Sequence, residues 1–226
     1  MFTIADRLAA IRERIASATA RAGRTVGSVE LLAVSKTFPD EVVAEAVAAG
    51  QTMFGENRVQ ELLAKQAVLP ALLHWHLIGP LQSNKIRKVL PAVTAIHSIG
   101  SLAIALDVDR IAGELSTRVK VYLEVNVAAE SSKHGFAPEA LRAALETLYS
   151  LRRLEVQGLM CIPPFDADVQ RCRPYFASLR ELRDSLETQG GVPLPGLSMG
   201  MSHDFEVAIE EGATIVRVGS ALFGGR

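Results

Sequence analysis

Two kinds of hydrophobic pattern alternate along the chain. Short apolar runs bounded by glycine, proline or asparagine are typical of buried strands, whereas apolar residues that recur every three to four positions are typical of amphipathic helices. The first segment is of the second kind, because charged positions separate its apolar residues Ile4, Leu8, Ile11 and Ile15. It predicts a helix that ends near Gly23 and precedes the first strand.

Eight short apolar runs follow this helix. The predicted strands are residues 31–35, 52–55, 74–78, 93–99, 119–127, 154–160, 197–199 and 213–218. The predicted helices are residues 39–50, a segment that opens at 56–57, and residues 83–90, 102–115, 138–149, 173–187 and 202–212. Strands that alternate with helices across short connections are typical of a parallel (β/α)8 barrel. We therefore expect the α/β class, as a single (β/α)8 TIM-type barrel with an extra N-terminal helix.

An open, doubly wound parallel sheet is the alternative to a barrel. That fold binds its ligand at a glycine-rich turn after the first strand. Here residues 35–39 follow the first strand and read Ser-Lys-Thr-Phe-Pro, without glycine, so the barrel is favoured. A length of 226 residues also suits one barrel, and we expect one domain over residues 1–226.

The balance of charge excludes several classes of partner. The chain has 24 lysine and arginine residues against 25 aspartate and glutamate residues, and aromatic residues make up 5%. A formal net charge of -1 provides no global field for nucleic acid or an anionic membrane, and so few aromatic residues make no stacking platform. We expect no nucleic-acid or membrane partner, and any anion must be bound locally.

Other features of the sequence favour a cytoplasmic protein. Charges within residues 6–13 interrupt what would be the apolar core of a signal peptide, and no window is apolar over the length of a membrane span. The two cysteines, Cys161 and Cys172, lack the close pairing of zinc ligands. We expect a reduced, soluble, cytoplasmic monomer.

Lys36 is the residue on which the chemical interpretation depends. It follows the first apolar run and is expected at the carboxyl end of a buried strand, where barrel active sites lie. Partial burial of an ammonium group favours the neutral amine, which is a competent nucleophile toward an aldehyde. The alternative is a lysine whose stem covers the core while its charge reaches water, and the apolar run by itself favours that alternative.

Small residues end the last two predicted strands, in residues 198–202 and 219–220. Small residues before a helix allow backbone N–H groups to approach a phosphate, and the last two loops of a barrel are its usual phosphate position. The residues expected to bind a phosphorylated ligand are Ser202, Gly219 and Ser220. The alternative is that Ser202 only caps a helix and Gly200 only makes a turn.

Arg217 lies among apolar neighbours within the last predicted strand. Burial of a guanidinium is unfavourable unless the group meets an acceptor. An ion pair with Glu124 is the structural explanation and a contact with a bound ligand is the functional one, and the sequence leaves both open.

His74 and His76 form an H-x-H pair on one face of a predicted strand, as in some barrel metal hydrolases. Those enzymes need the pair on the first strand, with further histidines and a carboxylate at later strand ends. His97, His134 and His203 do not supply that spacing. We expect no metal site, and we expect His76 to support the wall of the site.

Several motifs, in this order, closely resemble those of the pyridoxal 5'-phosphate homeostasis proteins. They are Ala-Val-Ser-Lys-Thr at 33–37, Phe-Gly-Glu-Asn at 54–57, His-Leu-Ile-Gly-Pro-Leu-Gln-Ser-Asn-Lys at 76–85, Leu-Ser-Met-Gly-Met-Ser at 197–202 and Val-Arg-Val-Gly-Ser at 216–220. The resemblance runs from the first helix to Arg226. It implies a barrel similar to that of alanine racemases, with the vitamin B6 cofactor pyridoxal 5'-phosphate (PLP) bound in it.

The resemblance also implies a role for each matching residue. Lys36 would hold PLP as a Schiff base, and Arg217 would face its pyridine nitrogen. The residues that would bind the phosphate are Ser202, Gly219 and Ser220.

Three further positions follow from the same resemblance. Asn57 would lie beside the PLP ring. Lys133 looks like the family's loop lysine that is associated with transfer or secondary binding of PLP. Arg58 departs from the pattern, because many members have tyrosine there.

An arginine opposite the pyridine nitrogen disfavours its protonation and so weakens PLP as an electron sink. Alanine racemases add a β-rich domain with a further acid/base residue, and we expect none here, because the chain stops eight residues after Val218. The expected function is intracellular PLP homeostasis, by a carrier without catalytic residues that delivers PLP to apo PLP-enzymes. The alternatives are a PLP-dependent, racemase-like enzyme and a Schiff-base aldolase that uses Lys36 without a cofactor.

Overall fold

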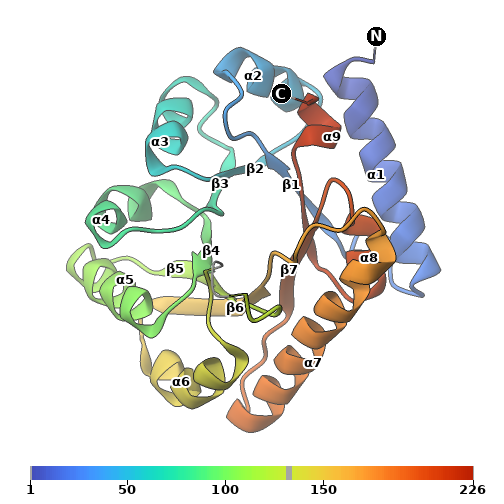
Figure 1. The fold of residues 1–226 in the computed structure, drawn as a ribbon. Coiled ribbons are helices and arrows are strands. Elements are labelled where there is room, and N and C mark those ends of the chain that lie inside the picture. Colours follow the sequence, from blue (N-terminus) through green and yellow to red (C-terminus); the bar gives the residue numbers. More distant parts are fainter. Residues whose placement is uncertain (1, 131–133, 226) are drawn as a thin grey trace.

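The structure is a computed structural model that describes residues 2–130 and 134–225. Within these ranges eight parallel strands form a closed barrel in the order β1 to β8, and β8 pairs with β1. Figure 1 shows the strands around a central axis with the helices outside them. The expected (β/α)8 barrel is confirmed, and the open sheet is excluded because an open sheet would have two unpaired edges.

The strands are short, with most of their residues buried. Their bounds are β1 Glu30–Val34, β2 Met53–Glu56, β3 His74–Leu77, β4 Ala95–Ile99, β5 Val119–Glu124, β6 Leu154–Met160, β7 Gly196–Met201 and β8 Ile215–Val218. The register between β7 and β8 shifts between Ser198 and Met201, where Gly200 has a φ of 90°. This irregularity bends β7 next to the loop expected to bind phosphate.

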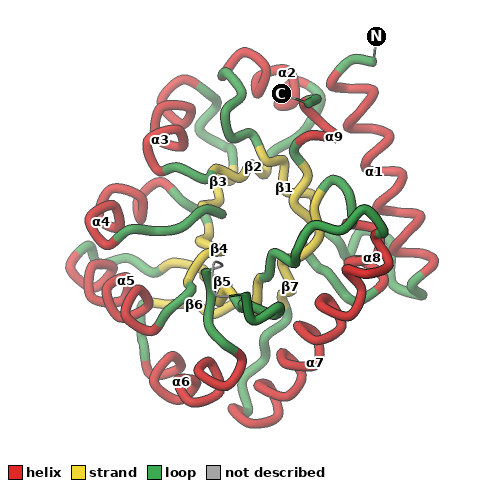
Figure 2. The backbone as a smooth tube through the Cα atoms, viewed as in Figure 1, coloured by secondary structure: helices red, strands yellow, loops and turns green. Residues whose placement is uncertain are grey.

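The helices form a ring that covers the outer face of the strands (Figure 2). Their bounds are α1 Ile4–Arg21, α2 Asp40–Ala48, α3 Val59–Val68, α4 Ile86–Val89, α5 Leu102–Glu114, α6 Pro138–Ser150, α7 Arg173–Gly190, α8 Phe205–Glu210 and α9 Ser220–Phe223. Short 3-10 helices are η1 Ser83–Lys85, η2 Leu90–Ala92 and η3 Val169–Cys172.

Three helices differ from the expectation. The helix expected over 83–90 is broken into η1, α4 and η2, and the last of these contains Pro91, which cannot donate to a helical ladder. α3 begins at Val59 and not at residues 56–57, because Glu56 still belongs to β2. α8 begins at Phe205 and not at residue 202.

The strand expected over 119–127 also ends early, at Glu124. Val125 makes an isolated bridge with Phe136, and the N–H of Phe136 donates to the carbonyl oxygen of Glu124 at 2.7 Å. The loop after β5 therefore returns to the strand end, which periodicity in the sequence does not reveal.

α1 lies at the N-terminal end of the chain and packs on α8 and α9, the last two helices, on the outside of the barrel. Thr3 and Asp6 cap its N-terminus reciprocally. Just beyond its C-terminus, Arg24 donates to the carbonyl oxygens of Ile209 and Ala213 at 3.0 and 2.7 Å. Figure 1 shows α1 alongside α8 and α9, so the N-terminal helix supports the units that carry the last two loops of the barrel.

The core has two layers of different character. A continuous apolar cluster fills the space between helices and strands and includes Phe54, Trp75 and Phe176. The apolar cluster inside the barrel is small and consists of Leu32, Tyr122, Met160 and Ile215. Buried polar residues share the interior with it, among them His76, His97, Ser198 and Arg217.

In the part of the chain that is described, no helix has both the length and the apolar character that a membrane crossing needs. Cys161 and Cys172 are both buried.

Candidate functional site

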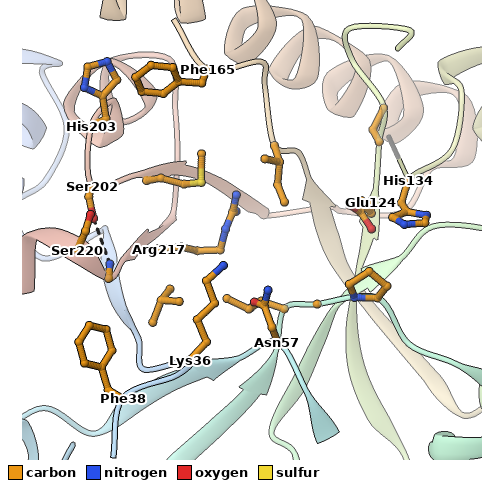
Figure 3. A pocket seen from close by; sticks show the side chains of 18 of the residues that line it. Lys36, Phe38, Asn57, Glu124, His134, Phe165, Ser202, His203, Arg217 and Ser220 are labelled. Atoms are coloured by element: carbon orange, nitrogen blue, oxygen red, sulfur yellow. Dashed lines mark hydrogen bonds between the residues drawn. The ribbon is translucent and has the colours of Figure 1, made fainter. Parts of the chain in front are cut away.

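A cavity of about 570 Å³ lies at the carboxyl ends of the barrel strands (Figure 3). Its lining includes all six described residues that were expected to bind a cofactor: Lys36, Asn57, Ser202, Arg217, Gly219 and Ser220. These residues come from the ends of β1, β2, β7 and β8 and from the loops that follow them. The closed barrel brings them together across about 180 residues of sequence, as expected for the carboxyl end of a parallel barrel.

Lys36 follows β1, and Figure 3 shows its side chain extending into the cavity toward Arg217. The peptide before it is held from outside the barrel. Lys65 of α3 donates to the carbonyl oxygen of Ser35 at 2.6 Å and to Glu56 Oε1 at 2.5 Å. The Ser35 hydroxyl donates to the same carboxylate oxygen at 2.7 Å. Lys65, Ser35 and Glu56 are all buried, so this cluster fixes the peptide that carries Lys36.

The residue after Lys36 is strained. Thr37 has a φ of 67°, which a β-branched residue rarely adopts. Its N–H donates to Glu61 Oε2 at 3.0 Å. Such a conformation persists only where its surroundings hold it. Lys36 is therefore bounded by a fixed peptide on one side and by a restrained turn on the other.

Ser202 joins the last two loops of the barrel. Its hydroxyl oxygen accepts hydrogen bonds from the backbone N–H groups of Gly219 at 3.1 Å and Ala221 at 3.2 Å. Ser202 is not the N-cap of α8, which is Asp204, so the capping alternative is wrong. A Cβ on Gly219 would lie 3.0 Å from the carbonyl oxygen of Val34. A side chain at Gly219 would therefore press on the end of β1.

Arg217 is buried, lines the cavity, and donates hydrogen bonds to neutral acceptors on its inner side. It donates through Nη1 to the carbonyl oxygen of Ser198 at 2.6 Å and to Ser198 Oγ at 2.9 Å, and through Nη2 to the carbonyl oxygen of Cys161 at 2.8 Å. Burial lowers the pKa of Arg217, and the negative charge of Glu124 opposes that shift. Among the described residues, the ion pairs do not include one between Arg217 and Glu124.

A buried polar chain continues from Arg217 into the barrel. His97 Nδ1 lies 2.8 Å from Ser198 Oγ, and His97 Nε2 lies 2.8 Å from His76 Nδ1. Burial lowers the pKa of His97 well below the usual value, and it lowers the pKa of His76 to about 4. Both rings are therefore neutral at neutral pH.

The buried histidines predict that the protein loses stability in mild acid. Between pH 6.5 and about 4 the unfolded state binds a proton at His76 that the folded state does not bind, so the free energy of unfolding falls as pH falls. His76 alone is expected to account for about 3 kcal/mol over this window. Urea unfolding of the H76Q variant should show a shallower pH dependence than wild type, whereas T19V, which removes a buried hydroxyl of α1, should keep the wild-type pH dependence. An unchanged slope in H76Q would contradict the prediction.

Asn57 is held beside the cavity by a close backbone approach. A Cβ on Gly79, in the loop after β3, would lie 2.3 Å from the carbonyl oxygen of Asn57. Ser98 donates to the carbonyl oxygen of Gly79 at 2.6 Å and fixes this loop from the other side. Glycine at position 79 is therefore a steric requirement of the site.

A G79A variant is expected to lose about 1–3 kcal/mol of stability, because the backbone at Asn57 must move. Its ligand affinity should fall as well, since Asn57 lines the cavity. The matched control is G113A in α5, where a Cβ meets nothing within 4 Å and alanine should stabilise the helix. Urea unfolding measures the stability of both variants, and equal changes in the free energy of unfolding of G79A and G113A would refute the steric argument.

Two titratable side chains of the cavity, Glu124 and His134, were not assigned to the site from the sequence, where Glu124 was considered only as an ion-pair partner of Arg217 and His134 only as a metal ligand. Burial raises the pKa of Glu124, while the positive charges of His134 and Arg217 oppose that shift. Glu124 lies two positions before Asn126 on the same strand face, so period-two alternation could have identified it. The loop that returns from β5 brings His134 to the cavity, and no local pattern predicts that closure.

Other polar residues at strand ends have different roles. His76 and Ser98 lie behind the lining, and Asn126, which lines the cavity, also donates to the carbonyl oxygen of Glu130 at 2.7 Å. Arg58 is exposed and pairs with Glu61 at 3.5 Å. Lys133 lies outside the described residues. Over residues 2–130 and 134–225, no cluster of histidine, cysteine and acidic residues is suited to a metal ion.

The family model for the alanine racemase N-terminal domain matches residues 7–226. A pyridoxal phosphate homeostasis protein of Aquifex aeolicus is 48% identical over 222 residues, which cover 98% of this chain and 97% of that protein. The protein of the same name from Escherichia coli is 39% identical and covers 100% of this chain and 98% of its own length.

Solved structures agree with these sequence relatives. PipY of Synechococcus elongatus with PLP bound is 43% identical, with a TM-score of 0.86 over 98% of this chain and 100% of that chain. The structure of PipY without PLP has a TM-score of 0.89 at 44% identity. An alanine racemase of Clostridium difficile is 16% identical, with a TM-score of 0.74, over 95% of this chain and 55% of that one. This last likeness concerns the fold alone.

Proposed function

The chain belongs to the alanine racemase N-terminal domain family, among its pyridoxal phosphate homeostasis proteins, and from this we propose that it binds PLP in the barrel cavity and serves PLP homeostasis as an intracellular carrier. The observation that carries the proposal is the meeting of Lys36, Arg217 and the loop of Ser202 in one cavity. The PLP-bound structure of PipY supports the choice of ligand.

The residues of the cavity fit each polar group of PLP. The amine of Lys36 suits the aldehyde, and the guanidinium of Arg217 suits the acceptor nitrogen of the ring. The hydroxyls of Ser202 and Ser220, with the close approach that Gly219 allows, suit the phosphate. A cavity of about 570 Å³ is of the size usual for small-molecule ligands.

The same residues suit retention of PLP more than its activation. Bound PLP supplies an aldehyde that condenses reversibly with primary amines and a ring that can take up negative charge. Lys36 is the amine that would hold it, so release requires hydrolysis or exchange with another amine. The positive charge of Arg217 disfavours a proton on the nitrogen that it faces, which weakens the ring as an electron sink.

Titration of the wild-type protein with PLP tests the proposal. We expect an absorption band in the visible range that saturates at one PLP per chain, and reduction with borohydride should leave one label, on Lys36. Absence of the band, or a label spread over several exposed lysines, would overturn the proposal and would favour an aldolase that uses Lys36 alone.

Glu124 and His134 favour one alternative function, a racemase-like enzyme. Both line the cavity with Lys36, and a carboxyl group with a raised pKa is a suitable acid or base. Incubation of the loaded protein with L- and D-amino acids in deuterated water tests for exchange of the α-proton. If the α-proton exchanges readily in the wild-type protein and this exchange is lost in E124Q, the racemase-like function would replace the carrier proposal.

Delivery of PLP completes the carrier proposal. The expected recipients are apo PLP-enzymes, and the expected participant from the chain is Lys133. Loaded protein should activate an apo-enzyme in the presence of a phosphatase that destroys free PLP, and K133A should slow this transfer. Size-exclusion chromatography, at the protein concentration used in the transfer assay, would test whether the protein is the expected monomer.

A further inference from the structure

The barrel interior contains a continuous hydrogen-bonded chain that ends on Arg217. It runs from Arg217 Nη1 to Ser198 Oγ at 2.9 Å, from Ser198 Oγ to His97 Nδ1 at 2.8 Å, and from His97 Nε2 to His76 Nδ1 at 2.8 Å. The four residues come from β8, β7, β4 and β3, and each is less than 5% exposed. The proposed function uses only the first of them directly.

The direction of each bond in this chain follows from the chemistry of Arg217. A guanidinium can only donate, so Ser198 Oγ is the acceptor of the first bond. The hydroxyl hydrogen of Ser198 is buried and needs an acceptor of its own, and His97 Nδ1 is the neighbouring atom that can supply one, so we assign Nδ1 as the acceptor. A neutral His97 therefore carries its hydrogen on Nε2 and donates it to His76 Nδ1.

The charge state of the two histidines agrees with this direction. Burial is the largest cause of the low pKa of His97, and the neighbouring His76 and Arg217 lower it further. The ring of His97 also packs on Tyr122, with the centroids 4.4 Å apart, so its plane is fixed. A protonated His97 would place a second buried positive charge one hydroxyl away from Arg217.

The chain ends at His76, whose hydrogen is then on Nε2. This nitrogen is buried and has no hydrogen-bond partner among the described residues. His76 can therefore act as the acceptor that His97 needs, without a competing bond that would impose the opposite tautomer.

We propose that His76, His97 and Ser198 are positioning residues that hold the guanidinium of Arg217 in one orientation at the cavity, an inference that rests on the proposed binding of PLP there. A serine hydroxyl rotates freely unless its hydrogen has an acceptor. His97 supplies that acceptor, so a lone pair of Ser198 stays directed at Arg217. The carbonyl oxygens of Ser198 and Cys161 complete the orientation.

Nitrogen-15 NMR of the histidine rings in the ligand-free protein tests the direction of the chain. We expect both His97 and His76 as neutral rings with hydrogen on Nε2 at pH 7. In S198A the nitrogen His97 Nδ1 loses its donor, and its chemical shift should change strongly. A wild-type His97 that carries hydrogen on Nδ1, or that is charged at pH 7, would overturn the proposal.

Variants then connect the chain to the ligand site. S198A and H97F should each weaken PLP binding about tenfold, the effect of one lost hydrogen bond, and should shift the absorption maximum of bound PLP. H97N should restore part of the affinity, because its amide oxygen can accept from Ser198 in place of Nδ1. The matched control is T19V, which removes the buried hydroxyl of Thr19 in α1, far from the cavity.

These outcomes distinguish failure of the proposed hydrogen-bonded chain from failure of the proposed function. Variants that lose stability but keep the wild-type affinity and absorption maximum would reduce the chain to a structural feature and overturn the inference. Failure of the wild-type protein to bind PLP would overturn the proposed function, whereas the ring tautomers would still be measured in the ligand-free protein.

Discussion

Replacing Lys36 by alanine is expected to abolish the visible absorption band of bound PLP and to weaken PLP binding by at least about 100-fold. Lys36 is the one lysine in the lining of the cavity among the described residues. Noncovalent contacts from Arg217 and the Ser202 loop would remain, so weak binding without the band is the expected residual behaviour. The measurement is a spectroscopic titration combined with equilibrium dialysis.

Two further variants make this result specific. K36R keeps the positive charge and most of the volume but lacks an amine that condenses with an aldehyde, so it should also lose the band. K88A removes an exposed lysine of α4 and should behave as wild type. A K36A protein that still shows the wild-type band would place the covalent bond on another lysine.

Replacing Lys65 by methionine is expected to lower the free energy of unfolding by about 3–5 kcal/mol, which corresponds to about 10 °C in the unfolding temperature. Lys65 is 7% exposed and Glu56 is fully buried, so the variant leaves a buried carboxylate without its partner. The second carboxylate oxygen, Glu56 Oε2, already has no hydrogen-bond partner among the described residues. Burial also raises the pKa of Glu56, in opposition to its bond with Lys65.

The effect should extend to the ligand site. Lys65 holds the carbonyl oxygen of Ser35, so its loss frees the peptide before Lys36, and K65M should bind PLP more weakly than wild type even where it is folded. The double variant E56Q/K65M removes the unpaired charge and should be more stable than K65M. R110M, which breaks exposed ion pairs of α5, should stay close to wild type in stability. A loss below about 1 kcal/mol in K65M would refute the prediction.

Local patterns in the sequence predicted the barrel because each strand and helix has its own period and its own breakers. The errors arise where a partner distant in sequence decides the conformation. Glu56 extends β2 because Lys65 and Ser35 bind its side chain, and β5 ends at Glu124 because Phe136 returns to pair there. Periodicity cannot register such contacts, because they depend on the closed barrel.

The features of the candidate site also fall into those that the sequence predicted and those that only the structure decided. The positions of Lys36, Ser202, Arg217 and Gly219 at strand ends, and the motifs around them, were sufficient to predict that they share a site and that the ligand is PLP. The sequence left open whether Arg217 pairs with Glu124 and whether Ser202 caps a helix. The structure decided both, because the acceptors and donors that these side chains contact come from distant segments of the sequence.

The sequence by itself therefore determined the order of the elements, the barrel and the residue types at its carboxyl end, since these depend on local periodicity and on one rule of parallel barrels. Only the tertiary structure decided how those residues are held: Lys36 by a buried ion pair behind its strand, and Arg217 by a chain of neutral side chains across the barrel. The physical reason is that burial and hydrogen-bond direction belong to groups brought together from different strands, and no single segment of sequence contains them.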